Sequence, residues 1–285
     1  MKILWLGKEQ KLADNYTPPE HEFLIMNREN FSMEKLKEFN PDVVIEREFN
    51  DAVSIYEYEW SYIKREMPHI KRAMWFIDTH VQFQRHLAYA AHFDFIFLAI
   101  SRYVPIFQNQ FPKAKVFWLP LCHPVTCLPP NSFGRDIKAS FVGRWGQTIY
   151  PERTVIVEEL KQEKWFQAVT DYNNVYQIMS NSIISFNRSY SEDMNFRVFE
   201  ALACGTELVT NEVPDILKIK GLKNRIHLYK RDGDAVKMVS DLVNGKRKFK
   251  SDAQSHRKYI MSFHLLKHRV TELLCMLQYG AQHDY

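Results

Sequence analysis

Strand-length apolar runs that alternate with helix-like segments are the feature that most constrains the fold of this chain. In the first half, these runs cover residues 3–6, 23–26, 43–45, 73–77, 93–100 and 116–119. Helical or mixed segments lie between them, at residues 33–38, 55–67, 81–91 and 103–110. Alternation of this kind indicates a parallel sheet with helices on both faces. We therefore expect the first half to form a Rossmann-like domain.

The same alternation resumes after a break at residues 128–134, where two prolines and a glycine end the periodicity as a linker does. The expected strands there are residues 139–142, 165–169, 182–186, 207–210 and 225–229. The expected helices are residues 156–161, 174–179, 194–204, 235–243, 252–262 and 265–277. The sequence thus predicts two α/β domains, residues 1–127 and residues 128–285.

Length and composition agree with this division. A chain of 285 residues is long for a single core, and 46% hydrophobic with 25% charged residues is typical of a folded protein. No apolar run reaches the ~18 residues of a membrane-spanning helix, and the N-terminus lacks a signal-peptide pattern. We expect a cytoplasmic protein without a transmembrane segment. Its four cysteines lack metal-ligand spacing and are expected to be reduced thiols.

The charge is mildly positive, at +4. This excess favours an anionic ligand or acceptor surface but does not select one. The one dense basic cluster is formed by Lys246, Arg247 and Lys248 with Lys250. A solvated helix start explains this cluster more simply than nucleic-acid binding, for which interleaved aromatic side chains would be expected.

The most informative local segment is residues 189–211, in which seven residues separate Glu192 from Glu200 near the start of the expected helix 194–204. On an ideal helix this spacing gives a rise of about 12 Å and an angle of about 80°. Two carboxylates so placed could bind the two ends of one extended ligand. Helix capping is an alternative for the first, because Ser189 and Glu192 fit an S-x-x-E capping box. Glu200 lies in an apolar stripe and needs a partner, because burying an unpaired carboxylate is costly.

Residues 195–205, Asn-Phe-Arg-Val-Phe-Glu-Ala-Leu-Ala-Cys-Gly, resemble the C-terminal domain of group 1 glycosyltransferases. The resemblance is to the E-x7-E superfamily, in particular its spore-maturation, CgeB-like branch, and it covers residues 139–274 best. It implies an α/β fold of the GT-B type, with two facing Rossmann-like domains and C-terminal helices. Ligands of open α/β sheets bind beyond the carboxyl ends of the strands, and in a GT-B fold two such edges face each other across a cleft.

The same resemblance assigns a nucleotide-sugar donor to the second domain. It implies that Glu200 binds the ribose hydroxyls and that Glu192 lies near the donor sugar. Asn195, Phe196 and Arg197 belong to the same motif and are expected beside the donor, although Arg197 could instead pair with a nearby carboxylate. The start of the expected helix would direct its free amides toward the phosphates.

Residues 141–144, Phe-Val-Gly-Arg, resemble the first strand and loop of that domain. There the family has a basic residue on the diphosphate and a second one a short distance on. Gly143 and Arg144 match the first position, and Arg153 is the nearest match to the second. Arginine suits this task because its planar fork binds phosphate oxygens in pairs and stays charged. For Arg153, a surface salt bridge is an equal alternative.

In the first domain, residues 75–80 end an expected strand at the carboxyl edge, where the resemblance places His80 near the donor sugar and the acceptor. A neutral histidine could hydrogen-bond a sugar hydroxyl, while Asp78 could orient it or accept a proton from the acceptor. A loop-capping role is the alternative for His80. Gly7 closes the first strand and could let the backbone approach the acceptor, although the family has more glycines there.

No cofactor and no metal are expected. The chain has no G-x-G-x-x-G motif and no P-loop, which argues against a dinucleotide dehydrogenase and a nucleoside triphosphatase. GT-B enzymes rely on basic residues and helix dipoles for the departing diphosphate, and residues 232–234, Asp-Gly-Asp, fit a turn and helix cap better than a metal site. His264 and His268 lack a third ligand, so surface positions are expected for them.

Together these patterns predict a hexosyl- or related glycosyltransferase that moves a sugar from a nucleoside diphosphate sugar to a hydroxyl acceptor, with retention and without a metal. The nucleotide sugar is a co-substrate, and the acceptor stays open among a polysaccharide, a protein, a small molecule and modified DNA. The alternatives are a GT-B nucleotide-sugar epimerase and a non-catalytic nucleotide-sugar-binding partner subunit. The catalytic candidates are His80, Asp78 and Glu192.

Overall fold

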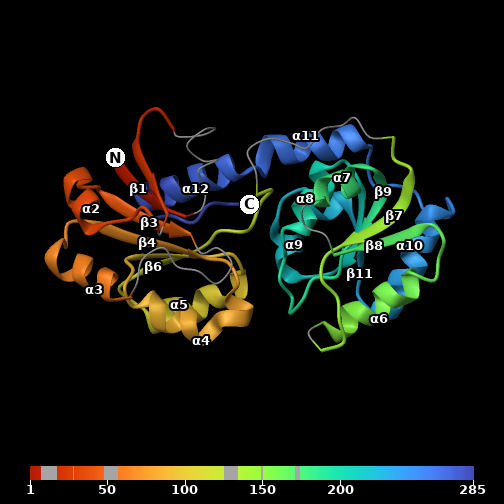
Figure 1. Ribbon diagram of the computed structural model, residues 1–285, viewed down its shortest axis with the longest axis horizontal. Helices are drawn as coiled ribbons and strands as arrows, with labels where there is room; N and C mark the ends of the chain where they lie inside the picture. Colours follow the sequence, from red (N-terminus) through yellow and green to blue (C-terminus); the bar gives the residue numbers. More distant parts are fainter. Residues whose placement is uncertain (8–17, 28, 48–56, 125–133, 149, 171–173) are drawn as a thin grey trace. The chain divides into compact units, whose positions relative to one another are not determined.

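The computed structural model describes residues 1–7, 18–27, 29–47, 57–124, 134–148, 150–170 and 174–285. These residues form two compact units (Figure 1). Unit 1 comprises Met1–Leu121 and Lys267–Asp284, and unit 2 comprises Cys122–Leu266 with Tyr285. Each unit contains one sheet, and the strand pairs of the described residues are parallel in both sheets.

Unit 1 is a parallel sheet wound with helices. Its strands are β1 (Lys2–Leu6), β2 (Glu22–Met26), β3 (Val43–Arg47), β4 (Lys71–Phe76), β5 (Phe95–Leu98) and β6 (Lys115–Trp118). Its helices are α2 (Met33–Phe39), α3 (Glu57–Glu66), α4 (Thr79–Ala90), the short η1 (Ser101–Tyr103), α5 (Val104–Gln110) and α12 (Leu266–Tyr279). The strand order β2-β1-β3-β4-β5-β6 reverses between β1 and β3, because the chain adds β2 on one side of β1 and β3 on the other.

The two faces of the unit 1 sheet are both covered. Leu4 and Leu6 of β1 belong to a core cluster with Trp60 of α3 and Phe107 of α5. Side chains alternate between the faces of a strand, so Trp5, which is fully buried, points to the other face. Helix α12 lies on the opposite side of the sheet from α4 and α5 (Figure 1). Burial on both faces explains why these strands read as continuous apolar runs.

Helix α12 belongs to unit 1, whereas the sequence predicts residues 128–285 as one domain. Its Arg269 is fully buried and donates from Nε to the carbonyl oxygen of Pro120 at 2.9 Å. Beyond the helix, Gln282 forms two hydrogen bonds of 2.9 Å with the backbone of Trp118. In the sequence, the two partners of these bonds are separated by 149 positions for Arg269 and by 164 positions for Gln282. Local sequence patterns cannot predict contacts over such separations. The predicted boundary after residue 127 lies outside the described residues.

Unit 2 repeats the architecture with a smaller sheet. Its strands are β7 (Ile137–Val142), β8 (Phe166–Val169), β9 (Ser182–Phe186), β10 (Glu207–Asn211) and β11 (Ile226–Tyr229). Its helices are α6 (Pro151–Leu160), α7 (Val175–Ser180), α8 (Arg197–Ala203), α9 (Pro214–Lys218), η2 (Lys223–Arg225), η3 (Asp232–Asp234), α10 (Ala235–Val243) and α11 (Ala253–Phe263). The order β11-β10-β9-β7-β8 reverses between β7 and β9.

Helices also cover both faces of the unit 2 sheet. Ile156 of α6 and Val239 of α10 join one core cluster with Phe186 of β9. Val142 of β7 belongs to another cluster, with Met179 of α7. Figure 1 shows α6 and α10 on one side of the sheet and α7 and α8 on the other. Because the helices cover the two faces, only loops lie at the carboxyl ends of the strands.

The helix that carries Glu200 is shorter than predicted. The sequence predicts a helix over residues 194–204, whereas α8 spans Arg197–Ala203. Ser191 and Glu192 have φ values of 51° and 57°, a left-handed conformation that a right-handed helix excludes. Glu192 therefore lies in a turn before the helix. The ideal-helix spacing of the two carboxylates therefore does not apply, and the alternative of a capping box at Ser189 and Glu192 is wrong.

The prediction of alternating strands and helices is otherwise confirmed, with most element ends within a few residues of their expected positions. Helix α6 begins at Pro151 rather than at residue 156, because proline is favoured in the first turn of a helix. The basic cluster at residues 246–250 lies in the exposed connection between α10 and α11, not at a helix start. His264 is buried beside the rings of Phe199 and Tyr259, not at the surface.

Within the described residues, no helix is both long enough and apolar enough to cross a membrane. Cys122, Cys204 and Cys275 are free thiols, as predicted, and Cys127 lies outside the described residues.

Candidate functional site

The candidate site is the carboxyl edge of the unit 2 sheet, where the strand order reverses between β7 and β9. Loops on either side of such a reversal diverge, and ligands of open parallel sheets bind between them. The loop after β7 begins with Gly143 and Arg144. The loop after β9 begins with Asn187, Arg188 and Ser189. An arginine therefore follows each of the two strands at the switch point.

Arg153 of α6 joins these two loops. Its Nη1 donates to the carbonyl oxygen of Arg144 at 2.9 Å, and its Nε and Nη2 donate to the carbonyl oxygen of Arg188 at 3.0 and 2.7 Å. The ring of Tyr150 lies 4.4 Å from its guanidinium carbon. The sequence left open a diphosphate contact and a surface salt bridge for Arg153. In the structure its donors bind backbone carbonyls and hold the two loops together.

Glycine is needed at position 143 because the Phe141 ring lies close to it, not because its backbone angles are unusual. Its N–H donates to the carbonyl oxygen of Val169 at 2.9 Å, which ties the loop to β8. A Cβ added there would lie 2.9 Å from the ring of Phe141. Any larger residue would displace that ring. Arg144 follows directly with an exposed side chain.

Arg188 is a candidate that the sequence analysis missed. Its side chain is 17% exposed, and its Nη2 forms an ion pair of 3.1 Å with Asp232. Its Nη1 donates to the carbonyl oxygen of Ser189 at 2.6 Å. These contacts fix a cation beside the switch point without removing it from solvent. The signal was available, since Arg188 is the first charged residue after an apolar strand.

Glu200 lies in the first turn of α8, where 5% of the residue is exposed. It forms an ion pair with Arg197, as the alternative for Arg197 predicted. The hydroxyl of Tyr176 donates to its Oε1 at 3.4 Å. Burial and the Glu200 charge raise the pKa of Tyr176, so this phenol stays protonated and remains a donor. The carboxylate is held in one orientation, with hydrogen-bond acceptor capacity beyond these two partners.

Arg197 also connects α8 to the switch point. Its Nε donates to the carbonyl oxygen of Val142, the last residue of β7, at 2.9 Å. The guanidinium thus joins Glu200 to the strand that precedes Arg144. These contacts bring two predicted donor-binding residues, Arg197 and Glu200, into one bonded network with the end of β7.

A second network, made of side-chain amides, lies at the ends of β9 and β10. Asn195 donates from Nδ2 to Oδ1 of Asn187 at 3.2 Å, and Asn187 donates to the hydroxyl of Thr210 at 3.0 Å. Asn211 accepts from the N–H of Ser189 at 2.7 Å. Oδ1 of Asn195 is buried and has no hydrogen-bond partner among the described residues. A ligand donor is the kind of group that this acceptor lacks.

Glu192 and Phe196 take different places from those expected. Glu192 is exposed in a turn that the N–H of Asp193 closes by donating to the carbonyl oxygen of Tyr190 at 3.0 Å. Phe196 is the N-cap residue of α8 and is half-buried. The helix start lies at Arg197, so the free amides predicted near Asp193 are not those of a helix.

In unit 1, Asp78 and His80 follow β4 at the carboxyl edge, as predicted. Asp78 is the N-cap residue of α4, and its carbonyl oxygen accepts from the N–H groups of Val81 and Gln82 at 2.9 and 3.0 Å. His80 lies in the first turn. Burial, and then the charge of Arg102, lower the pKa of His80 from 6.5 to about 4. Its imidazole is therefore neutral near pH 7.

Gly7 follows β1 directly at the switch point of unit 1, where its N–H donates to the carbonyl oxygen of Met26 at 3.0 Å. The neighbouring β3 ends in Glu46 and Arg47, both buried, which the sequence analysis did not select. The guanidinium of Arg47 lies 5.0 Å from the ring of Trp75. In the sequence, these two residues could have been selected because they are a pair of charged residues at the end of an apolar strand.

Comparison with known proteins agrees with this architecture. Residues 133–275, half of the chain, match the family model described as glycosyl transferase-like. The sequence matches no curated protein. The chain is similar to the pneumococcal O-GlcNAc transferase GtfA in complex with UDP and GlcNAc, at 14% identity and a TM-score of 0.56. That match covers 86% of this chain and 59% of GtfA, so this chain spans about three fifths of its length.

Two further structures match almost end to end. Anabaena HepE in complex with UDP and glucose is 10% identical with a TM-score of 0.61, and the match covers 98% of this chain and 100% of HepE. A putative UDP-N-acetylglucosamine 2-epimerase from Listeria monocytogenes is 10% identical with a TM-score of 0.58, and the match covers 98% and 96%. At these identities the likeness shows the fold. The predicted fold class, two parallel-sheet α/β domains of the GT-B type, is confirmed.

Proposed function

The chain belongs to the glycosyl transferase-like family, and from this premise we propose that it moves a sugar from a nucleoside diphosphate sugar to a hydroxyl acceptor. One observation carries the proposal. At the unit 2 switch point, Arg144 and Arg188 follow β7 and β9, Arg153 joins their loops, and Arg197 orients the Glu200 carboxylate toward the same strand end. Cations beside a held carboxylate suit a ligand that has both a diphosphate and a sugar hydroxyl pair.

Each group has a role that its chemistry supports. Arg144 and Arg188 would bind the diphosphate oxygens, because a guanidinium offers paired donors at any physiological pH. Glu200 would accept hydrogen bonds from the ribose hydroxyls, and Oδ1 of Asn195 would accept one from the donor. Phe196 and Gly143 shape the same edge. UDP is the first nucleotide to test, because the pneumococcal and Anabaena structures contain it.

Catalysis would come from positioning and from stabilising charge on the leaving diphosphate. In unit 1, the neutral imidazole of His80 would hydrogen-bond a sugar hydroxyl, and Asp78 would accept a proton from the acceptor. Glu192 stays a candidate near the donor sugar, and Gly7 a candidate on the acceptor side. We propose a retaining reaction without a metal, and a place in the CgeB-like branch, on the motif at residues 195–205. The acceptor is a polysaccharide, a protein, a small molecule or, least supported, modified DNA.

Epimerisation of a nucleotide sugar is the second candidate, because the chain is similar to the Listeria epimerase over nearly its full length. The two reactions differ in what they need. Incubation with a UDP-sugar and no acceptor would convert the sugar if the protein is an epimerase, whereas a transferase would release only slow hydrolysis products.

Calorimetry with UDP tests the proposed site. We expect UDP to bind the intact chain, and Arg144→Ala to weaken binding. Lys138→Ala is the matched control, because Lys138 is an exposed cation on the same strand, β7, away from its carboxyl end. Equal affinity of the Arg144→Ala and Lys138→Ala proteins would refute the site. Turnover abolished by EDTA and restored by manganese would refute the metal-independent mechanism.

A further inference from the structure

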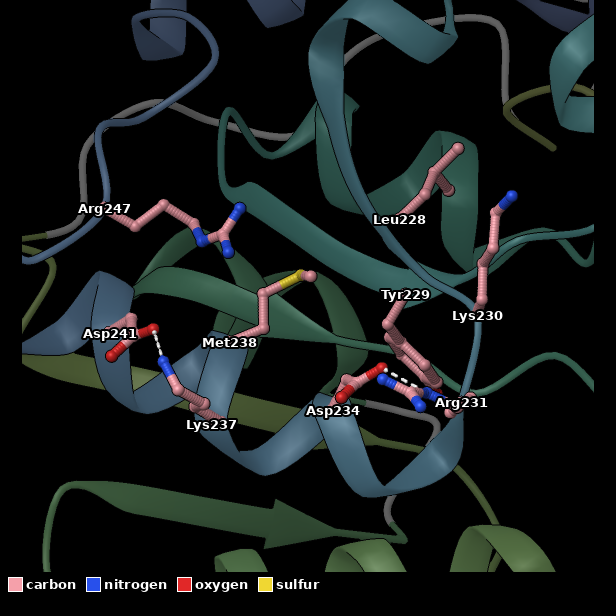
Figure 2. A pocket seen from close by; sticks show the side chains of 9 residues that line it. All are labelled: Leu228, Tyr229, Lys230, Arg231, Asp234, Lys237, Met238, Asp241 and Arg247. Atoms are coloured by element: carbon pink, nitrogen blue, oxygen red, sulfur yellow. Dashed lines mark hydrogen bonds and ion pairs between the residues drawn. The ribbon is translucent and has the colours of Figure 1, made fainter.

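A second functional surface lies on unit 2, formed by β11, α10 and the connection after α10. A groove of about 640 Å³ opens there (Figure 2). Its lining residues are Leu228, Tyr229, Lys230, Arg231, Asp234, Lys237, Met238, Asp241 and Arg247. None of them is among the residues proposed to bind the donor.

This region concentrates the positive charge of the chain. Residues 221–250 contain nine lysines and arginines and three aspartates, a net charge of +6, whereas the whole chain has +4. The rest of the chain is therefore slightly negative. Such asymmetry orients a protein toward an anionic surface before contact.

The groove cations are exposed and only weakly paired. The side chains of Lys230, Arg231 and Lys237 are 77%, 85% and 75% exposed. Their carboxylate partners lie at 3.7, 3.2 and 2.7 Å. Exposed pairs of this kind contribute only about 0–1 kcal/mol, so another anion can replace the carboxylates.

The connection at residues 246–250, Lys-Arg-Lys-Phe-Lys, adds four cations to this surface. Backbone hydrogen bonds hold it in place at both ends. At its start, the N–H groups of Lys246 and Arg247 donate to the carbonyl oxygen of Asp241 at 2.8 and 3.1 Å. At its end, the N–H of Lys250 donates to the buried carboxylate of Glu207 at 2.5 Å. The backbone is anchored at both ends while all five side chains are exposed.

Phe249 adds an apolar group to this array. Half of it is exposed, between cations on both sides. A half-exposed phenylalanine flanked by lysines offers an apolar group that can enter the boundary between lipid headgroups and hydrocarbon. Arg247 belongs both to this segment and to the groove, so the two form one surface.

We propose that this surface, residues 246–250 with the groove cations Lys230, Arg231 and Lys237, docks unit 2 on an anionic lipid bilayer. The cations meet lipid phosphates, and Phe249 enters the interface. A protein partner is disfavoured, because interface cores are depleted in lysine and aspartate, both of which line this groove. Single-stranded nucleic acid is disfavoured, because its bases stack on successive aromatic side chains and this segment offers one.

Vesicle sedimentation of the full chain tests the proposal. We expect binding to phosphatidylcholine vesicles that contain about one third phosphatidylglycerol, no binding to phosphatidylcholine alone, and release as salt is raised. Reversing Lys246, Arg247 and Lys248 to glutamate should weaken binding by about a hundredfold, since each cation near an anionic surface adds to the affinity. Phe249→Ser should weaken it severalfold at unchanged net charge.

The matched control reverses three exposed lysines of unit 1, Lys35, Lys37 and Lys71, to glutamate. It makes the same change in net charge and should leave most of the binding. Circular dichroism checks that each variant folds, and Phe249→Ser decides the test if the triple variant does not. The proposal is overturned if the intact chain does not bind anionic vesicles or if both triple variants lose binding equally. It is also overturned if a single-stranded oligonucleotide binds as tightly as the vesicles and Phe249→Ser changes neither.

Discussion

The two ends of the unit 2 strands both gather buried polar side chains, and the two clusters differ in the groups that lie beside them. At the amino end of β10, the carboxylate of Glu207 accepts from Nε2 of His227 at 2.6 Å, from Nε2 of His256 at 3.1 Å and from the N–H of Lys250 at 2.5 Å. All three side chains are at most 3% exposed. The carboxylate is thereby surrounded by protein donors, while Nδ1 of His227 and Nδ1 of His256 are buried without a hydrogen-bond partner among the described residues.

The carboxyl end of the same sheet is bonded but left open. Oδ1 of Asn195 and Nε of Arg188 are buried and have no hydrogen-bond partner among the described residues. Arg144 is exposed beside them on the neighbouring loop. Both clusters thus contain buried polar atoms without a partner, which cost free energy unless a ligand supplies one, but in the Glu207 cluster a protein carboxylate already occupies the centre. We therefore predict a structural role for the Glu207 cluster and ligand binding at the switch point.

The largest effect should come from breaking the Glu207 cluster. Glu207→Ala leaves His227 and His256 buried without their carboxylate, and we expect the free energy of unfolding to fall by about 3–5 kcal/mol. Urea denaturation measures this change. UDP affinity of the folded protein should stay unchanged, and a large loss of UDP binding at temperatures where the variant is folded would contradict the division of roles.

The pH dependence of the free energy of unfolding should also depend on the Glu207 cluster. Burial alone raises the pKa of Glu207, but hydrogen bonds from His227, His256 and Lys250 outweigh it and lower the pKa from 4.5 to about 2. A depressed pKa means that the carboxylate stabilises the fold above pH 4.5 and loses this contribution as the pH falls to about 2. We expect Glu207→Gln to flatten the pH dependence of unfolding in that window. An unchanged slope would show that Glu207 is not the group that titrates.

The His80→Ala variant tests whether the carboxyl edge of unit 1 serves the chemical step while the carboxyl edge of unit 2 binds the nucleotide. We expect His80→Ala to lower turnover about a hundredfold, the smaller end of what one preorganised hydrogen bond to the reacting group contributes, while UDP affinity changes little. A loss in the chemical step with binding preserved identifies an interaction made in the transition state. UDP release from a UDP-sugar measures turnover. Loss of UDP binding as severe as in Arg144→Ala would place the nucleotide contact on unit 1 instead.

Arg144→Ala should weaken UDP binding about 30-fold, because a charge-assisted hydrogen bond to phosphate contributes roughly 2 kcal/mol. The free energy of unfolding should change little, since the side chain is exposed. Calorimetry and denaturation of the same preparation give both numbers. If Arg144→Ala instead lowers the free energy of unfolding and leaves UDP affinity unchanged, Arg144 has a structural role and does not bind the diphosphate.

Glu200→Gln should have the smallest effect, about tenfold on UDP affinity, since the amide keeps one acceptor oxygen and loses the charge. Because Glu200 also pairs with Arg197, stability should fall modestly as well. Arg197→Gln is the control, because it removes the same ion pair and keeps the carboxylate. Equal losses of UDP affinity in both variants would attribute the effect to the ion pair and not to a ribose contact.

Local patterns were sufficient for most of the fold. The strands β1 to β11 were predicted because helices cover both faces of each sheet, so the central strands are buried on both sides and read as apolar runs, while the partly exposed edge strands β2 and β8 still keep apolar residues. Asp78 and His80 were placed at a strand end for the same reason. Helix α8 was misplaced at its start, because the left-handed backbone of Ser191 and Glu192 leaves no trace in a sequence that otherwise favours a helix.

Roles that depend on distant partners were out of reach. Arg153 resembles a phosphate ligand, but its donors bind carbonyl oxygens 9 and 35 residues away. In the sequence Glu207 is an ordinary strand residue, and only the fold places His227 and His256 beside it, from 20 and 49 residues further along the chain.

The sequence by itself determined the two α/β units, their alternation of strands and helices, and the kinds of side chain that follow each strand, because burial imposes periods that are local. Tertiary structure alone decided which of those side chains are closed by protein partners and which stay open to a ligand. It also decided that α12 belongs with unit 1 and that residues 246–250 are held in place. The physical reason is that hydrogen bonds join residues by distance in space, which the order of residues along the chain does not encode.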